Sequence, residues 1–237
     1  MIDFLTDLDT KILLFFNGLN APFFDYFMMI FTGKVIWTPM YVSIIYILFR
    51  RFGWKVALYY TLALPIMILC VDQLCASLIS PLTERLRPTN LENPISAFIH
   101  IVDDYRGGRY GFPSCHAANS FALATFLSVL FTKRRFTFFI FTWAFITSYS
   151  RMYLGVHYPG DLLVGAIIGC AIGYIIYIIA KQVTKYISTP RDIEPQNLYA
   201  QFSIKGTTIS YQLPDIMIII GLTTTLFIII YSLIAWL

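Results

Sequence analysis

Residues 150–161 read SRMYLGVHYPGD and join two long apolar runs of the chain. Within this stretch Arg151 follows Ser150, His157 comes six residues after the arginine, and Asp161 comes four residues after the histidine. A hydroxyl, a guanidinium, an imidazole and a carboxylate are therefore gathered where one apolar segment ends and the next begins. This pattern predicts a functional site at the boundary of a hydrophobic region.

Two earlier segments have the same placement. Residues 85–88 read RLRP and residues 111–116 read GFPSCH, and each is a polar stretch at the edge of an apolar run. We therefore expect both segments to meet residues 150–161.

The composition requires a membrane. The chain of 237 residues is 58% hydrophobic and 13% charged, and its mean hydropathy is +0.70. A soluble domain carries roughly 25% charged residues, so this chain cannot solvate its own surface. It contains several runs of the roughly 20 apolar residues that span a bilayer core. The sequence therefore predicts an integral membrane protein.

The four cysteines have no metal-ligand spacing, and three of them lie inside apolar runs; they are Cys70, Cys75, Cys115 and Cys170. Their interpretation is as small buried hydrophobic side chains rather than as disulfides or a metal site.

The apolar runs predict an all-α, polytopic fold with six transmembrane helices and an N-terminal interfacial helix. Residues 1–20 mix acidic and apolar side chains, which suits an amphipathic helix on the membrane surface. The expected spans cover about 22–49, 54–80, 114–131, 136–150, 161–180 and 215–236. Within the polar segment 181–214, residues 202–206 and 207–211 alternate like a small hairpin. Residues 1–237 are expected to form a single membrane-embedded domain with its motif core at about 70–180.

The distribution of basic residues predicts the topology. Three connections carry ten lysines and arginines, at 50–55, 133–135 and 181–205, and all three fall on one face of a six-span layout. The positive-inside rule assigns that face to the cytoplasm. Both termini and all three polar segments then lie on the opposite face. The positive-inside rule does not explain the arginines on that face, so their presence there needs another reason, such as binding an anion.

The residue types suit the hydrolysis of a phosphate ester. Arg87 and Arg151 can each offer a bidentate fork to phosphate oxygens. Ser114 can add a hydroxyl at the start of the third predicted span, where backbone N–H groups and the helix dipole also favour an anion. These three residues are the candidate phosphate-binding set, and no metal is expected.

The remaining polar residues suit the bond-making steps. His157 is the candidate nucleophile, and Asp161, one helical turn further on, can hold its other ring nitrogen. His116 can protonate the leaving alkoxide.

Each residue also has a structural interpretation. Juxtamembrane arginines contact headgroups, and Asp161 can serve as an N-terminal helix charge. Asp72 and Gln73, inside the second predicted span, are costly there and are interpreted as contacts between helices. The joint spacing, order and side of the three segments favour the functional interpretation.

These segments resemble the type 2 phosphatidic acid phosphatase family, membrane lipid phosphatases that share a core with vanadium haloperoxidases. The family's third motif, Ser-Arg-x5-His-x3-Asp, is matched completely by residues 150–161. Its second motif, Pro-Ser-Gly-His, is matched by residues 113–116, except that Cys115 stands where glycine is usual. Its first motif, Lys-x6-Arg-Pro, is matched by Arg87 and Pro88, but Ser80 occupies the lysine position.

The resemblance implies a role for each matched position. His157 corresponds to the nucleophile that forms a phosphohistidine, Asp161 to its orienting partner and His116 to the general acid. The phosphate cradle corresponds to Arg87, Arg151 and Ser114. Arg85 is the candidate to replace the lysine missing at Ser80, and the resemblance implies neither metal nor cofactor.

The resemblance also implies a multi-pass protein of a bacterial inner membrane, with its site and both termini periplasmic. The partners are then the bilayer and a membrane lipid phosphate, and no nucleic acid is expected. Lipid A is the favoured substrate; undecaprenyl pyrophosphate, phosphatidylglycerophosphate and phosphatidic acid are the others, and the loop 89–112 is expected to select the headgroup. One alternative is a non-catalytic lipid-phosphate binder or transporter, which the missing lysine favours and the intact His116, His157 and Asp161 argue against. The other is a haloperoxidase-like oxidant, whose relatives are soluble.

Overall fold

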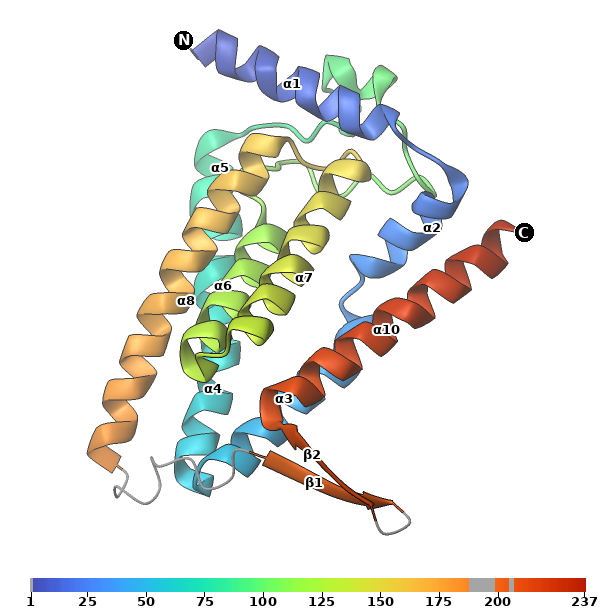
Figure 1. Ribbon diagram of the computed structural model, residues 1–237. Coiled ribbons are helices and arrows are strands. Elements are labelled where there is room, and N and C mark those ends of the chain that lie inside the picture. The colour runs from blue at the N-terminus through green and yellow to red at the C-terminus, as the bar shows by residue number, and fades with distance from the viewer. Residues whose placement is uncertain (1, 188–198, 205–206) are drawn as a thin grey trace.

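The computed structural model describes residues 2–187, 199–204 and 207–237, and the regular structure in these residues is helical apart from one hairpin (Figure 1). The α-helices are α1 (Ile2–Gly18), α2 (Pro22–Phe31), α3 (Thr38–Arg51), α4 (Trp54–Asp72), α5 (Ser80–Thr83), α6 (Cys115–Phe131), α7 (Arg134–Tyr153), α8 (Pro159–Ile187) and α10 (Leu213–Trp236). Two short 3-10 helices are η1 (Val35–Trp37) and η3 (Pro94–Phe98), and a π-helical turn is η2 (Gln73–Ile79).

Helices α4, α6, α7 and α8 run side by side, and α1 lies across their upper ends (Figure 1). Helix α10 packs against α2 and α3 on another side. The long connection between α5 and α6 lies at the same end as α1. All three motifs are therefore carried by loops and helix ends at one end of the molecule.

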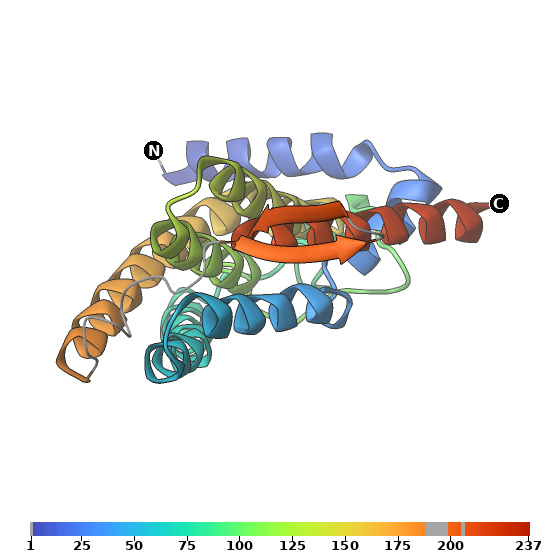
Figure 2. The same ribbon diagram turned by 60° about the horizontal axis from the view of Figure 1, so that its bottom comes forward.

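The hairpin lies at the end opposite α1 (Figures 1 and 2). Strand β1 (Tyr199–Ile204) pairs antiparallel with β2 (Thr207–Gln212). The hairpin expected at 202–211 is therefore confirmed, although its turn at 205–206 lies outside the described residues. Residues 188–198 of the predicted polar segment lie outside them as well.

The prediction of a single helix over 22–49 is wrong. The chain forms α2, stops at Thr32, and begins again through η1 and α3. Gly33 N donates to Ile30 O at 3.0 Å and the indole of Trp37 donates to Phe31 O at 2.8 Å, so the last carbonyls of α2 are satisfied by the turn itself. Pro39 sits in the first turn of α3, where its missing N–H costs nothing, instead of kinking a longer helix.

Three described helices are long and apolar enough to cross a membrane: Trp54–Thr83, Pro159–Tyr186 and Leu213–Trp236. A fourth span results if α1 and α2, which are bent by 115°, count as one broken element. Helix α6 is apolar but has only 17 residues. The chain is therefore a helical membrane protein, and the count of six spans stays a prediction.

Glycines let α6 and α8 approach each other closely. Gly165, Gly169 and Gly173 form a stripe along α8, and a Cβ at any of them would collide with a backbone carbonyl of α6. Small residues four apart bring helix backbones together in this way in membrane proteins. At the site end of this contact Ser114 N donates to the Asp161 carbonyl at 3.0 Å. The start of α6 is therefore fixed against the start of α8.

Gly169→Ala should destabilise the fold, because the added methyl group would overlap the Ala118 carbonyl. Such overpacking costs about 1–3 kcal/mol. Thermal unfolding in detergent should show a lowered midpoint. The matched control is Gly18→Ala, where an added Cβ meets nothing within 4 Å; equal midpoints for the two variants would contradict the close contact.

Candidate active site

His157 is buried in the centre of the motif cluster. One of its ring nitrogens faces a carboxylate and the other faces a guanidinium. Its side chain is 1% exposed. The Nδ1 atom lies 3.4 Å from Asp161 Oδ2, and Nε2 lies 2.7 Å from Arg87 Nη1. Because a guanidinium can only donate, Nε2 accepts and the ring proton is on Nδ1. The unprotonated nitrogen therefore faces the arginine.

The surroundings of His157 keep its ring neutral. Burial lowers the pKa of His157 well below its usual value of 6.5, and the charges of Arg87 and Arg151 lower it further. A hydrogen bond to the Gly111 backbone opposes this shift without reversing it. A neutral imidazole keeps one unprotonated nitrogen, which a nucleophile requires, and in His157 this nitrogen accepts a hydrogen bond from Arg87.

The two arginines carry buried donors without partners. Arg151 is 2% exposed; its Nη1 donates to Thr32 Oγ1 at 3.0 Å and its Nη2 donates to the Tyr105 hydroxyl at 2.8 Å. Its Nε, like the Nε of Arg87, is buried with no hydrogen-bond partner among the described residues. Buried donors are normally paired. Two unpaired guanidinium donors beside a neutral histidine fit an anion-binding centre.

Ser114 and His116 approach the centre from the start of α6. Ser114 is the N-cap residue, fully buried, and its Oγ accepts from Ala117 N at 3.4 Å. His116 follows one residue after Cys115, close enough to His157 and Arg151 for their charges to act on its ring. Ser150, by contrast, donates to the Thr147 carbonyl at 2.7 Å within α7.

Both terminal nitrogens of Arg85 donate hydrogen bonds to carboxylates. Its Nη1 donates to Asp161 Oδ1 at 2.7 Å, its Nη2 donates to Asp9 Oδ2 at 2.6 Å, and its guanidinium carbon lies 4.0 Å from the centre of the Tyr158 ring. The structure thus places Arg85 behind Asp161, on the side away from the Nε2 atom of His157. Its binding of phosphate stays a prediction, and the contacts favour a positioning role.

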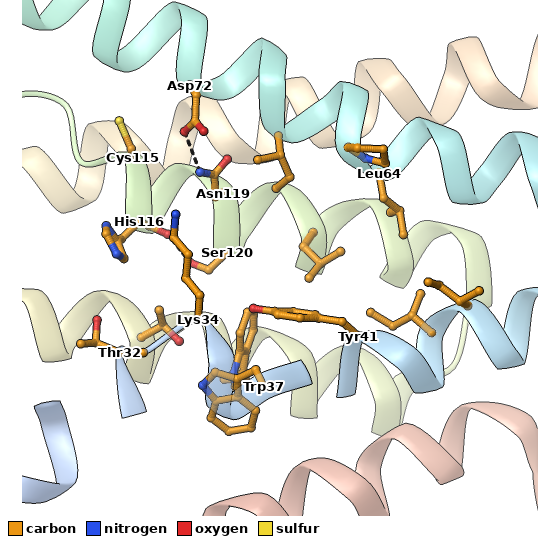
Figure 3. Close-up of a pocket in the computed structure, with 18 of the residues that line it drawn as sticks. Thr32, Lys34, Trp37, Tyr41, Leu64, Asp72, Cys115, His116, Asn119 and Ser120 are labelled. Carbon is orange, nitrogen blue, oxygen red and sulfur yellow. Dashed lines mark hydrogen bonds between the residues drawn. The ribbon is translucent and has the colours of Figure 1, made fainter. Parts of the chain in front are cut away.

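A cavity of about 530 Å³ adjoins the cluster between α3, α4 and α6. Lys34, His116 and Asn119 form a polar end, and the rest of the lining is mostly apolar, as Figure 3 shows. Asn119 donates to Asp72 Oδ1 at 2.8 Å across two helices, which confirms the predicted interhelical contact of Asp72. His116 therefore belongs both to the motif residues and to the polar end of a cavity that suits hydrocarbon.

Residues 54–185, more than half of the chain, match the model of the PAP2 superfamily. The chain belongs to the PAP2 superfamily. The resemblance found in the three motifs is thereby confirmed.

Two curated relatives of this PAP2 chain are lipid A 4′-phosphatases. The protein from Bacteroides thetaiotaomicron is 52% identical over 99% of both chains. The protein from Porphyromonas gingivalis is 30% identical over 88% of this chain and 89% of its own length. The crystal structure of Aquifex aeolicus LpxE has a TM-score of 0.54 and 25% identity, and the match covers 71% of this chain and 94% of that one.

Two contributions to the PAP2 site were missed by the sequence analysis. Asp9 of α1 accepts from Arg85 and also from Gly160 N at 2.7 Å, so it joins the N-terminal helix to the start of α8. Gly111 approaches the cluster so closely that a Cβ there would lie 3.2 Å from Asp161 Oδ2. Gly111 belongs to the GFPSCH segment, whereas no sequence pattern identifies Asp9 as part of the site.

Asp9→Asn should weaken the link between α1 and the site. Asparagine keeps an acceptor for Gly160 N but removes the charge that faces Arg85, at a cost of about 1–2 kcal/mol. The midpoint of thermal unfolding should fall in this variant. Asp7→Asn is the control, because Asp7 forms only an exposed pair with Lys11 within α1; an equal fall in both variants would contradict a link through Asp9.

The pKa of His157 predicts a stability effect with a definite sign. Because the folded pKa is lowered, the unfolded chain binds more protons below about pH 6.5, and the free energy of unfolding falls as the pH is lowered. His157→Gln removes this contribution. Unfolding midpoints should be compared between about pH 7.5 and about pH 5. The wild type should lose more stability than the variant, and equal losses would show that His157 does not titrate in this way.

Proposed function

We propose that this chain is a membrane lipid phosphatase that removes the 4′-phosphate of lipid A. The observation that carries the proposal is the junction at His116, where an anion-binding centre meets a largely apolar cavity. A substrate that fits both has a phosphate on a lipid. The two lipid A 4′-phosphatases that resemble this chain over most of its length support lipid A among such lipids.

In the proposed reaction, His157 Nε2 attacks phosphorus. The bond between phosphorus and the lipid oxygen breaks, and His116, which is protonated while the bound phosphate anion offsets the neighbouring cations, gives its proton to the leaving alkoxide. The resulting phosphohistidine is hydrolysed by water, whose proton returns to His116, so that phosphate is released and both histidines are restored. Asp161 holds the Nδ1 proton and stabilises the positive charge on the phosphorylated ring.

The charge that develops on the phosphate oxygens is neutralised by protein groups in this proposal. Arg87 and Arg151 would turn their unpaired Nε donors and their forks toward it. Ser114 and the first N–H groups of α6 add a helix N-terminus. The mechanism therefore assigns no step to a metal ion, and the rate should be unchanged when a chelator is added.

The proposal also includes a place for the protein. The site end of α4, α6 and α8 would face the periplasm from a bacterial inner membrane, and α1 would lie in the interface above it. The chain would act as one domain over 1–237 with six spans, in which α6 and α7 cross the bilayer together with the longer helices. The acidic and apolar mixture of α1 and the basic connections at the opposite end support this orientation.

His157→Ala should lower phosphate release from lipid A by at least about a thousandfold, because it removes the nucleophile. The assay uses purified protein in detergent and compares lipid A with and without a phosphate at the 4′ position. Undecaprenyl pyrophosphate, phosphatidylglycerophosphate and phosphatidic acid complete the panel. Release should depend on the 4′-phosphate.

The matched control is His100→Ala, which removes a histidine that pairs with Asp25 outside the motif cluster. It should keep the wild-type rate. Retained turnover in His157→Ala would remove the nucleophile assignment. Release from another lipid alone would replace lipid A as the substrate, and release from none would favour a non-catalytic binder.

A further inference from the structure

The candidate phosphate-binding set lacks one positively charged residue that the first motif of the family contains. Position 80, where that motif has lysine, holds the half-buried Ser80 at the start of the short helix α5. Arg85, the nearest candidate to replace it, is bound by two carboxylates. Two other arginines of the loop are also engaged: Arg106 donates to the Thr89 carbonyl at 3.0 Å and Arg109 pairs with Glu92 at 2.8 Å.

A lysine from a different part of the chain lies at the cluster instead. Lys34 belongs to the turn between α2 and η1, where the predicted helix 22–49 is broken. It lines the cavity together with His116 and Asn119, and Figure 3 shows its side chain reaching toward both of them. Its charge acts on the ring of His116. The ammonium group is therefore at the polar end of the cavity.

The same turn contacts the phosphate cradle through a second residue. Thr32, two residues before Lys34, accepts a hydrogen bond from Arg151 at 3.0 Å. Both Thr32 and Lys34 line the cavity. The turn thus lines the cavity, across from the start of α6 that carries Ser114 and His116. The hydrogen bond from the buried Arg151 fixes the position of this turn.

Lys34 has no partner that would explain its place. Among the described residues it makes no hydrogen bond and no ion pair, and the nearest carboxylate of the cavity lining, Asp72, is held by Asn119. The exposed ammonium of Lys34 is therefore free to bind a ligand that enters the polar end of the cavity. Its position beside the ring of His116, in a turn that also contacts Arg151, favours an anionic ligand.

We propose that Lys34 supplies the cation that position 80 lacks, by binding a phosphate oxygen of the substrate at the mouth of the cavity. The inference rests on the proposed function for its substrate, a lipid phosphate. It assigns to the break after α2 a task in binding, because the break places an ammonium beside His116 at the polar end of the cavity. Arg85 is then left to position Asp161.

The test compares Lys34→Met, which removes the charge but keeps the length, with Lys34→Arg, which keeps the charge. The value of kcat/KM for phosphate release from lipid A should fall about 100-fold in the methionine variant, the order lost when one preorganised charge is removed from a site. The arginine variant should recover most of it. Inorganic phosphate, used as a competitive inhibitor, should bind the methionine variant more weakly by a similar factor.

Lys55→Met is the matched control, because Lys55 lies at the far end of α4 beside Trp54. It should keep the wild-type kcat/KM and the wild-type affinity for inorganic phosphate. Unfolding midpoints of all variants establish that folding is retained, which is expected because Lys34 is exposed and unpaired in the described residues.

The outcomes separate the two proposals. If the wild type hydrolyses lipid A and Lys34→Met matches it in both kcat/KM and phosphate affinity, the Lys34 assignment is wrong and the phosphatase proposal stands. If the wild type hydrolyses no lipid phosphate, the proposed function fails, and the affinity for inorganic phosphate still decides whether Lys34 binds the anion.

Discussion

The close contact between α6 and α8 is the constraint on which the site depends. Three glycines of α8 allow its backbone to touch that of α6, and this contact continues to the ends of both helices. Ser114 N then reaches the Asp161 carbonyl. Since His116 lies close after Ser114 and His157 shortly before Asp161, the register of the two helices decides how the two imidazoles lie relative to each other. A displacement along the helix axis by one residue, about 1.5 Å, would change that arrangement.

Burial and neighbouring charges together set the protonation state of His157. Burial, and after it the charges of Arg87 and Arg151, lower the pKa of His157, while Asp161 faces the proton on Nδ1. Asp161 is itself held by Arg85, and Arg85 by Asp9, so charges alternate in sign from the centre to α1. This alternation pairs both carboxylates with Arg85 and leaves the neutral ring of His157 between Asp161 and Arg87.

Features that depend on residues close together in the sequence could be predicted from it. The helix start at Ser114 followed from a proline and a serine before an apolar run, and the three motifs were recognisable because each keeps its spacing within a few residues. Asp9, Thr32 and Lys34 could not be found in this way, since their proximity to the motifs depends on how α1 and α2 fold back over the bundle. The break at Thr32–Lys34 was within reach, because a glycine beside two polar residues interrupts an apolar run, but hydropathy alone averages over so short an interruption. The glycine stripe of α8 has a period of four and was also readable, although its partner helix was not.

The bend between α1 and α2 has a consequence for where the functional unit of this chain begins. The region matched by the family model starts at residue 54, yet Asp9 comes from before the bend and Thr32 follows the helix after it. The contact between Asp9 and Gly160 joins residues 151 positions apart in the chain. During synthesis the first helix is therefore complete long before its partner exists, and it must remain available until α8 has been made. A fragment limited to the family core would have the motifs but not the segment that closes around them, so the unit that folds around the motifs is larger than the region by which the family is recognised.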